Sequence, residues 1–202
     1  MIKFYSDAKQ DQFVANILNF KKNGYCVDIG SNHSVISNNT YVFQDWDWTS
    51  ISIESDGVYN ESYSTRKSGV HLNENALTVD YKKIFEEYEF PKSIDYLSLD
   101  VDTASLSVLR ILPLDEYRFK VITIEHDQYL YGDTYRKSQR ELLQSHGYFL
   151  LCSDVYAEQP GYEGKECPFE DWWIDPSEFS EELIEKIKCD KTLPSVIISK
   201  FS

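Results

Sequence analysis

The sequence predicts an α/β fold, in which helices cover a mostly parallel sheet. Short apolar runs rich in β-branched residues alternate along the chain with longer amphipathic stretches, the pattern of such folds. Two apolar runs near the C-terminal end, 148–155 and 170–174, follow one another across a polar loop at 159–168, so we expect them to pair as an antiparallel hairpin. With 202 residues, of which 42% are hydrophobic, the chain is long enough to bury one sizeable core.

The first predicted strand ends in a glycine loop. Residues 25–32 read Tyr-Cys-Val-Asp-Ile-Gly-Ser-Asn, an apolar run that stops at Gly30 and small polar groups. Such loops lie at the carboxyl ends of parallel strands, where ligands bind in open α/β sheets. Gly30 would let the backbone approach a ligand closely, and Asp28 could hold an amine or a hydroxyl of that ligand. The alternative for Gly30 is an ordinary turn at the end of a strand.

The second predicted strand, 50–54, ends in an acid, Glu54. A carboxylate one βα unit after a glycine loop is the usual arrangement for binding the two hydroxyl groups of a ribose. Either feature alone is common in proteins. Together, and in this order along the chain, the glycine loop and Glu54 favour a ligand that contains a nucleoside.

The rest of the chain continues the alternation. Residues 80–90 have the apolar spacing of an amphipathic helix that ends before Pro91, and residues 119–124 form the strongest strand signal. Further helices are expected over 7–23, 37–45, 56–66, 104–112, 134–146 and 180–188, and further strands over 70–75, 94–101 and, at a sheet edge, 195–199. We expect one domain, made of an N-terminal helical segment (1–24), a ligand-binding core (25–176) and a C-terminal helix with a tail (177–202).

The charge of the chain argues against two classes of partner. Twenty Lys and Arg against 34 Asp and Glu give a net charge of −14, which disfavours binding to nucleic acid or to an anionic membrane surface. No stretch has the pattern of a signal peptide or could span a bilayer, and the four cysteines are scattered without a CxxC pair. We therefore expect a cytoplasmic protein with free thiols and no structural zinc.

Several motifs, in a consistent order and at plausible spacings, resemble the FkbM-type branch of S-adenosylmethionine-dependent methyltransferases. The resemblance runs from about residue 24 to residue 176. It is carried by Val27-Asp28-Ile29-Gly30, Ser37-Asn38-Asn39-Thr40, Trp48, Ile53-Glu54, the segments 94–100 and 121–127, Gly147-Tyr148 and Glu170-Asp171-Trp172-Trp173. It implies a Rossmann-like class I methyltransferase fold, with a mostly parallel seven-stranded sheet whose last strand runs antiparallel.

The resemblance also implies which residues hold S-adenosylmethionine. The glycine loop would hold the methionine part, Glu54 the ribose, and Asn75-Ala76 the adenine, where the family often has Asp-Ala. The residues expected on the cofactor are Asp28, Gly30, Ser31, Asn32, Glu54, Asn75 and Asp100.

The chain departs from the family pattern at three places. His33-Ser34 stand where the first loop usually carries another glycine, and Asp102-Thr103 stand where the fourth strand is usually followed by Glu-Gly. The segment 54–78 is also shorter than is common in the family.

Methyl transfer needs an oriented acceptor that has lost its proton. His126 is the candidate for the general base, because the reference pKa of histidine, about 6.5, suits proton removal at neutral pH. Asp100 and Glu125 follow or end neighbouring strands and are further candidates for the catalytic site. The alternative for His126 is a hydrogen-bonded structural role, and for the acids a solvated surface.

Asp100, Asp102 and Glu125 could also bind a divalent cation. A Mg²⁺ ion needs only one or two protein carboxylates, with waters and substrate oxygens completing its shell. The leading hypothesis is a methyltransferase that acts on a hydroxyl group of a small molecule, sugar or glycan. Two other functions stay open: a cofactor-binding domain without turnover, suggested by the missing glycines, and a metal-dependent hydrolase or transferase built on the three carboxylates.

Overall fold

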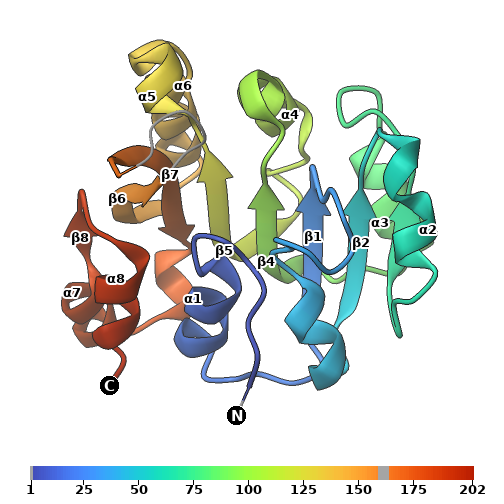
Figure 1. Cartoon of the computed structure of the whole chain (residues 1–202), viewed down its shortest axis with the longest axis horizontal. Helices are drawn as coiled ribbons and strands as arrows, with labels where there is room; N and C mark the ends of the chain where they lie inside the picture. The colour runs from blue at the N-terminus through green and yellow to red at the C-terminus, as the bar shows by residue number, and fades with distance from the viewer. Residues whose placement is uncertain (1, 159–163) are drawn as a thin grey trace.

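One mixed sheet forms the centre of the molecule. The computed structural model describes residues 2–158 and 164–202. Within these residues the sheet has eight strands in the order β3-β2-β1-β4-β5-β7-β6-β8 (Figure 1). They are β1 (Tyr25–Ile29), β2 (Thr49–Ile53), β3 (Val70–Leu72), β4 (Ser93–Leu99), β5 (Arg118–Glu125), β6 (Phe149–Glu158), β7 (Glu166–Ile174) and β8 (Cys189–Asp190). Neighbouring strands are parallel, except that β7 runs antiparallel to both β5 and β6.

Helices cover both faces of this sheet. The α-helices are α1 (Gln10–Ile17), α2 (Asn60–Tyr63), α3 (Tyr81–Glu87), α4 (Ser105–Ile111), α5 (Gln128–Tyr131), α6 (Asp133–Ser145), α7 (Glu181–Ile187) and α8 (Pro194–Ser199). Short 3-10 helices are η1 (Tyr41–Trp46), η2 (Gly57–Tyr59), η3 (Asp102–Ala104) and η4 (Pro176–Glu178). One apolar cluster joins α3, α4 and α6 to one face of the sheet, and a second joins α1, η1, α7 and α8 to the other.

The alternation of side chains along β1 follows from this two-sided burial. Val27 and Ile29 pack into the first cluster, whereas Cys26 packs into the second. Each such buried Val or Ile contributes about 1.5–3 kcal/mol to folding. Asp28 is on the same side as Cys26, because successive residues of a strand point to opposite faces. The one acid of β1 is therefore buried and needs specific partners.

Local signals set where several helices begin. The carboxylate of Asp80 accepts a hydrogen bond from the backbone N–H of Lys83, and the hydroxyl of Ser180 accepts one from that of Leu183. These are N-caps, which satisfy backbone donors that have no partner inside the helix. Pro194 opens α8, at a position where its missing N–H costs nothing.

The structure confirms the predicted α/β class, the parallel core and the β6–β7 hairpin. The strand predicted at 195–199 is wrong: these residues belong to α8, because Pro194 begins a helix whose apolar side packs into the second cluster. The edge strand is instead the two-residue β8, an addition to the seven expected strands.

Three predicted helices are shorter than expected. The helix at 7–23 ends at Ile17, because Asn19 and Phe20 adopt the left-handed conformation, with φ of 50° and 52°. The helices at 37–45 and 56–66 become η1 and the pair η2–α2. The polar loop predicted at 159–168 falls partly outside the described residues, and its last three residues already belong to β7.

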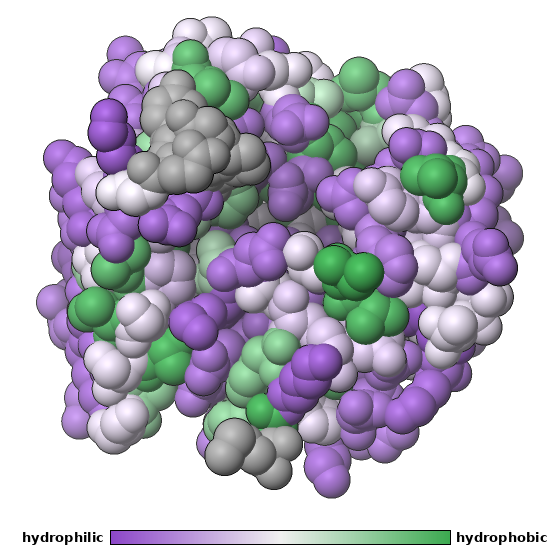
Figure 2. Space-filling model, viewed as in Figure 1, coloured by the Kyte–Doolittle hydropathy of each residue, from purple (hydrophilic) through white to green (hydrophobic). Residues whose placement is uncertain are grey.

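The carboxyl ends of β1, β2, β4 and β5 lie at one edge of the sheet, marked by their arrowheads in Figure 1. In the same view, Figure 2 shows a largely hydrophilic surface with separate groups of hydrophobic residues. Among the described residues, every helix is too short or too polar to cross a membrane. The features that follow gather at the carboxyl edge of the sheet.

Candidate active site

A crevice opens at the carboxyl ends of the central strands. It consists of two adjoining cavities of about 520 and 280 Å³. Gly30, Asn32 and Asp100 line both cavities, so they are two parts of one crevice that crosses β1 between β2 and β4. The order of the strands reverses between β1 and β4, and this is where open α/β sheets bind ligands.

Gly30 is required where β1 meets the end of β4. Its φ is +80°, and a Cβ built on it would lie 1.7 Å from the backbone oxygen of Asp100. The sequence suggested that this glycine leaves space for a ligand. Its backbone does line the crevice, but the missing side chain makes room for Asp100.

Asp28 is buried beside the larger cavity and held by neutral donors. Its Oδ2 accepts hydrogen bonds from Thr40 Oγ1 at 2.9 Å and from Asn38 Nδ2 at 3.3 Å. Burial raises the pKa of Asp28 to about 6, although Arg66 and the hydrogen bonds act in the opposite direction. A positively charged group bound in the cavity would therefore lower the pKa of Asp28 and favour its ionised form.

Asn39, in the same cavity, was quoted in the sequence motif without a role. Its Nδ2 donates to Ser98 Oγ at 3.0 Å, whereas its Oδ1 is buried and lacks a hydrogen-bond partner among the described residues. A buried carbonyl oxygen without a donor is costly. A ligand bearing an N–H group would satisfy it. The Asn38-Asn39-Thr40 run just after the glycine loop was the signal for this part of the site.

The loop after Gly30 keeps its shape without the glycine that the family pattern expects. His33 Nδ1 accepts from the backbone N–H groups of Val35 and Ile36, both at 3.1 Å, so the imidazole closes the turn. Ser31 Oγ accepts from the Tyr63 hydroxyl at 2.6 Å, which fixes the start of the loop. Where the family pattern has a glycine with a flexible backbone, this chain thus has His33, whose side chain fixes the turn by hydrogen bonds.

Glu54 and Asn75 lie together in the smaller cavity. Glu54 is only 9% exposed; its Oε2 accepts from the N–H of Asn32 at 3.1 Å and its Oε1 from that of Asp56 at 2.7 Å. These two bonds fix the carboxylate and leave each oxygen a further lone pair. Asn75 and Ala76 form the next part of the wall, with the Asn75 side chain held by the N–H of Leu77.

Asp100 stands at the centre of a group of buried carboxyls. Its charge helps to raise the pKa of Asp28, Glu125, Asp127 and Glu170, in each case after burial, which is the larger cause. Burial likewise raises the pKa of Asp100 itself, against a hydrogen bond with Glu125. Burial and mutual repulsion thus give each acid of this group a higher proton affinity than an ordinary carboxyl.

Two of these acids converge with the exposed Asp102 at the outer end of the group. Asp102, Glu125 and Asp127 place one carboxylate oxygen each within 4.8 Å of one another. Glu125 Oε2 and Asp127 Oδ1 are buried and have no hydrogen-bond partner among the described residues. The sequence analysis named Asp100, Asp102 and Glu125 as possible metal ligands. The structure instead groups Asp102 and Glu125 with Asp127, which the sequence analysis had included only within the segment 121–127.

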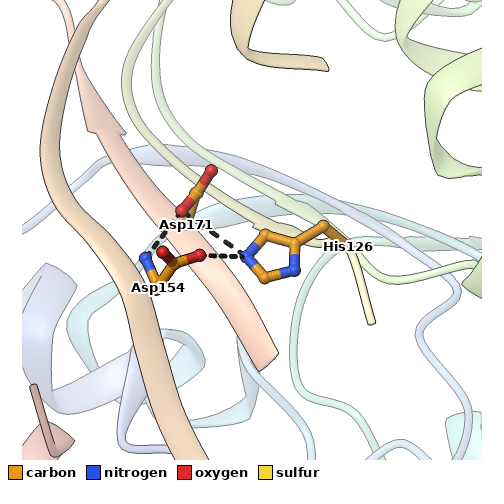
Figure 3. Close-up of side chains that lie close together, drawn as sticks. All are labelled: His126, Asp154 and Asp171. Carbon is orange, nitrogen blue, oxygen red and sulfur yellow. Dashed lines mark hydrogen bonds and ion pairs between the residues drawn. The ribbon is translucent and has the colours of Figure 1, made fainter. Parts of the chain in front are cut away.

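His126 lies outside the walls of both cavities. Its side chain is fully buried, and its Nδ1 accepts from the backbone N–H of Gln128 at 3.2 Å. Its Nε2 faces away from the crevice toward Asp154 and Asp171, with one oxygen of each at 3.5 Å (Figure 3). The structure therefore separates His126 from Asp100 and Glu125, with which the sequence analysis grouped it.

The carboxylates that face His126 belong to a network of ion pairs. Arg140 binds both oxygens of Asp171 at 2.7 Å and reaches Asp154 Oδ1 at 2.8 Å, and Arg136 binds the same oxygen at 2.6 Å. Burial alone would raise the pKa of Asp171, but hydrogen bonds from Arg140 and His126 outweigh it and lower that pKa. Pairing of this quality ties α6 to β6 and β7 directly behind the crevice.

Comparison with known proteins supports this description. The family model named "Methyltransferase FkbM domain" matches residues 9–150. A comparison with curated proteins gave no match. This match covers well over half of the chain and most of the residues that line the crevice, so it identifies the family of the chain.

Solved structures with the same fold have low sequence identity to this chain. A TehB-like SAM-dependent methyltransferase from Corynebacterium glutamicum gives a TM-score of 0.50 at 10% identity, covering 85% of this chain and 88% of that one. Spermidine synthase from Thermotoga maritima gives 0.55 at 13%, covering 96% and 71%. The fibrillarin pre-rRNA processing protein of Methanococcus jannaschii gives 0.50 at 13%, covering 82% and 75%. At such identities the likeness shows the fold alone, which is the Rossmann-like class I methyltransferase fold predicted from sequence.

Proposed function

The chain belongs to the FkbM methyltransferase domain family, and we propose that it transfers a methyl group from S-adenosylmethionine to a hydroxyl of a small molecule, sugar or glycan. The observation that carries this proposal is the set of residues that line the two adjoining cavities of the crevice. One cavity has the acid and the orphaned amide oxygen suited to an amino acid, and the adjoining cavity has the fixed carboxylate suited to a ribose. They meet at Gly30 and Asp100, where the sulfur between those two halves of the cofactor would lie.

The residues of the crevice fit the cofactor group by group. Asp28 and Asn39 Oδ1 suit the ammonium of the methionine part, since both are acceptors and Asn39 has a lone pair without a partner. Glu54 suits the ribose hydroxyls, and Asn75 borders the space for the adenine. When bound, S-adenosylmethionine supplies an electrophilic methyl group. The protein's part is to orient the acceptor, exclude water and take its proton.

We propose that Asp100, rather than His126, is the base that removes the proton of the acceptor hydroxyl. Asp100 borders both cavities, and its raised pKa makes it a stronger base than an ordinary aspartate. Glu125 interacts with Asp100 and helps to set its proton affinity. The nitrogen atoms of His126 are directed to Gln128 and to the ion-pair network, which suits a positioning role.

A divalent cation such as Mg²⁺ is a second proposal for the same acids. The converging carboxylate oxygens of Asp102, Glu125 and Asp127 are of the kind that Mg²⁺ prefers. A cation held there would lower the pKa of an acceptor hydroxyl that binds it. The same set supports the alternative hydrolase hypothesis, but a hydrolase would not need a ribose contact at Glu54 in the smaller cavity.

The charge of the crevice favours a small acceptor over nucleic acid. The walls of the two cavities contain Asp7, Asp28, Glu54, Asp100 and Asp102, and neither Lys nor Arg occurs among the described residues that line them. A phosphate backbone would be repelled by such a surface on a chain of net charge −14. The crevice therefore suits an uncharged or cationic acceptor.

Calorimetry and a transfer assay test the proposal together. S-adenosylhomocysteine, the demethylated product, should bind the purified chain, and Glu54→Ala should weaken binding by about 1.5–3 kcal/mol, the value of a hydrogen bond to a charged group. Glu61→Ala, an exposed acid on α2, is the matched control. Failure of the parent to bind would sink the methyltransferase proposal.

The transfer assay separates the remaining functions. Label from methyl-labelled S-adenosylmethionine should appear in hydroxylated acceptors of a panel that also contains amines and RNA. Binding without transfer to any member would support the cofactor-binding domain without turnover, whereas transfer to RNA alone would overturn the proposed acceptor class. Hydrolysis of ester substrates without cofactor binding would support the metal-dependent hydrolase.

A further inference from the structure

Two of the four cysteines are direct neighbours on adjacent strands. Cys152 of β6 and Cys189 of β8 are register partners in a parallel pair, so their side chains project from the same side of the sheet. Neighbouring strands lie about 4.8 Å apart, within the Cα separation of about 4.4–6.8 Å that a disulfide spans. Both cysteines are free thiols in the structure.

The two thiols differ in a way that suits thiol–disulfide exchange. Cys189 is partly exposed, whereas Cys152 is fully buried. A hydrogen bond with Cys152 and the charge of Lys200 lower the pKa of Cys189 to about 7, while burial raises that of Cys152. The Lys200 ammonium is held in place by the carbonyl oxygens of Ile187 and Lys188, at 2.9 and 2.8 Å. Cys189 is thus the thiolate that reaches solvent, and Cys152 is a thiol behind it.

The other two cysteines lack this arrangement. Cys26 is buried in β1, where burial raises its pKa, and β4, β5 and β7 lie between β1 and β6 in the sheet. Cys167, in β7, is paired in register with Ala157. They serve as internal references for a reaction that belongs to Cys152 and Cys189.

We propose that Cys152 and Cys189 form a reversible intramolecular disulfide by exchange with a low-molecular-weight disulfide such as glutathione disulfide. The Cys189 thiolate attacks one sulfur of glutathione disulfide, and one glutathione thiolate leaves. Cys152 then gives up its proton, and its sulfur attacks the Cys189 sulfur of the mixed disulfide and displaces the second glutathione. Two protein thiols are oxidised, and one glutathione disulfide is reduced to two glutathione molecules.

The bond would fasten the C-terminal segment to the sheet. β8 has two residues, and α7 and α8 on either side of it cover one face of the sheet. Apart from β-ladder bonds, β8 and the turn after it are tied to β6 by a few hydrogen bonds, among them Ser153 Oγ to Asp190 Oδ1 at 2.6 Å. A cross-link here closes the long loop between residues 152 and 189 and reduces the freedom of the unfolded chain.

The test is made first on the unaltered protein. The folded chain is incubated with glutathione disulfide, the reaction is quenched with acid, and the mass of the intact protein is measured by mass spectrometry. We expect a loss of about 2 Da, reversed by dithiothreitol, and a peptide map with a Cys152–Cys189 cross-link while Cys26 and Cys167 stay reduced. The melting temperature should rise by roughly 5 °C on oxidation.

Variants identify the order of attack. Cys152→Ala should stop at a glutathione adduct of about 305 Da on Cys189, and Cys189→Ser should not react. Cys167→Ala is the control and should cross-link as the parent does. A parent protein that only accumulates the adduct on Cys189, that does not react, or that cross-links another pair would overturn the proposal.

Discussion

The backbone oxygen of Asp100 occupies the space that a side chain at Gly30 would need. The separation of 1.7 Å from a Cβ built at Gly30 is far inside van der Waals contact, and the φ of +80° adds strain for any other residue. Gly30 and Asp100 therefore form the joint that brings β1 and β4 together under the crevice. This joint is made by the chain's own atoms.

Gly30→Ala should accordingly destabilise the protein in the absence of cofactor. The left-handed backbone costs about 1–3 kcal/mol and the clash with Asp100 adds to it, so we expect the free energy of unfolding to fall by at least about 2 kcal/mol. Denaturant unfolding without cofactor measures it. Gly57→Ala is the control, because the nearest atom to its added Cβ, Asn73 Oδ1, is at an acceptable 3.4 Å. Equal stabilities for the two variants would show that Gly30 is not a structural joint.

His126→Ala should mainly affect stability. The substitution removes a fully buried ring beside Asp154 and Asp171, which keep their ion pairs with Arg136 and Arg140, and deletion of a large buried side chain costs about 2–5 kcal/mol. His146→Ala, at the partly exposed end of α6, should cost less. In the fraction that remains folded, turnover should stay within about tenfold of the parent. A loss of about 10²–10⁴ at unchanged stability would instead restore His126 as the base.

Asp100→Asn and chelation distinguish the two ways of removing the acceptor's proton. If Asp100 is the base, Asp100→Asn should lower turnover by about 10²–10⁴ while cofactor binding persists, and EDTA should have no effect. If a cation acts, EDTA should abolish activity, Mg²⁺ should restore it, and Asp127→Asn should be as severe as removal of the cation. Asp115→Asn, a highly exposed acid, controls for the loss of one charge. Activity that survives both treatments would exclude both assignments.

Glu170 should give the cofactor-free protein a characteristic pH dependence. Its Oε1 accepts from Trp172 Nε1 at 2.8 Å, and burial raises its pKa to about 8 from an ordinary value of about 4.5. Between these values the folded chain keeps a proton that the unfolded chain has lost, so the free energy of unfolding falls as the pH rises from about 4.5 to 8. Glu170→Gln, which retains the acceptor, should flatten this slope and leave the variant more stable than the parent at pH 8. Glu61→Gln should reproduce the parental slope.

Sequence reasoning located the glycine loop, Glu54 and the strand-end acids because each depends on a few consecutive residues. A parallel strand that ends in glycine, and another that ends in an acid, bring their last residues to one edge whatever the rest of the chain does. Glu54 was expected at this edge from its place at the end of a strand, whereas Asn75, which lines the same cavity, was expected there only from the resemblance to the FkbM family.

The direction of His126 could not be predicted, because it depends on contacts with a distant strand. Just beyond β5, the N–H groups of His126 and Asp127 both donate to the carbonyl of Phe169 in β7, and Asp127 adopts a left-handed conformation with φ of 46°. These contacts send the imidazole toward Asp154 and Asp171. The run at 195–199 shows the converse case, in which β-branched residues suggest a strand but Pro194 and the apolar packing of α8 decide for a helix.

The carboxyl groups gathered around Asp100 make the crevice sensitive to the charge on the sulfur that it holds. The methyl donor is a sulfonium cation, and the thioether left after transfer is neutral, so ionised carboxylates attract the first more than the second. In the proposed reaction, each turnover would thereby weaken the binding of the spent cofactor and favour its replacement by a fresh one. Calorimetry measures the dissociation constant of S-adenosylhomocysteine divided by that of S-adenosylmethionine. This ratio should fall toward unity in Asp100→Asn, and an unchanged ratio would show that release depends on other contacts.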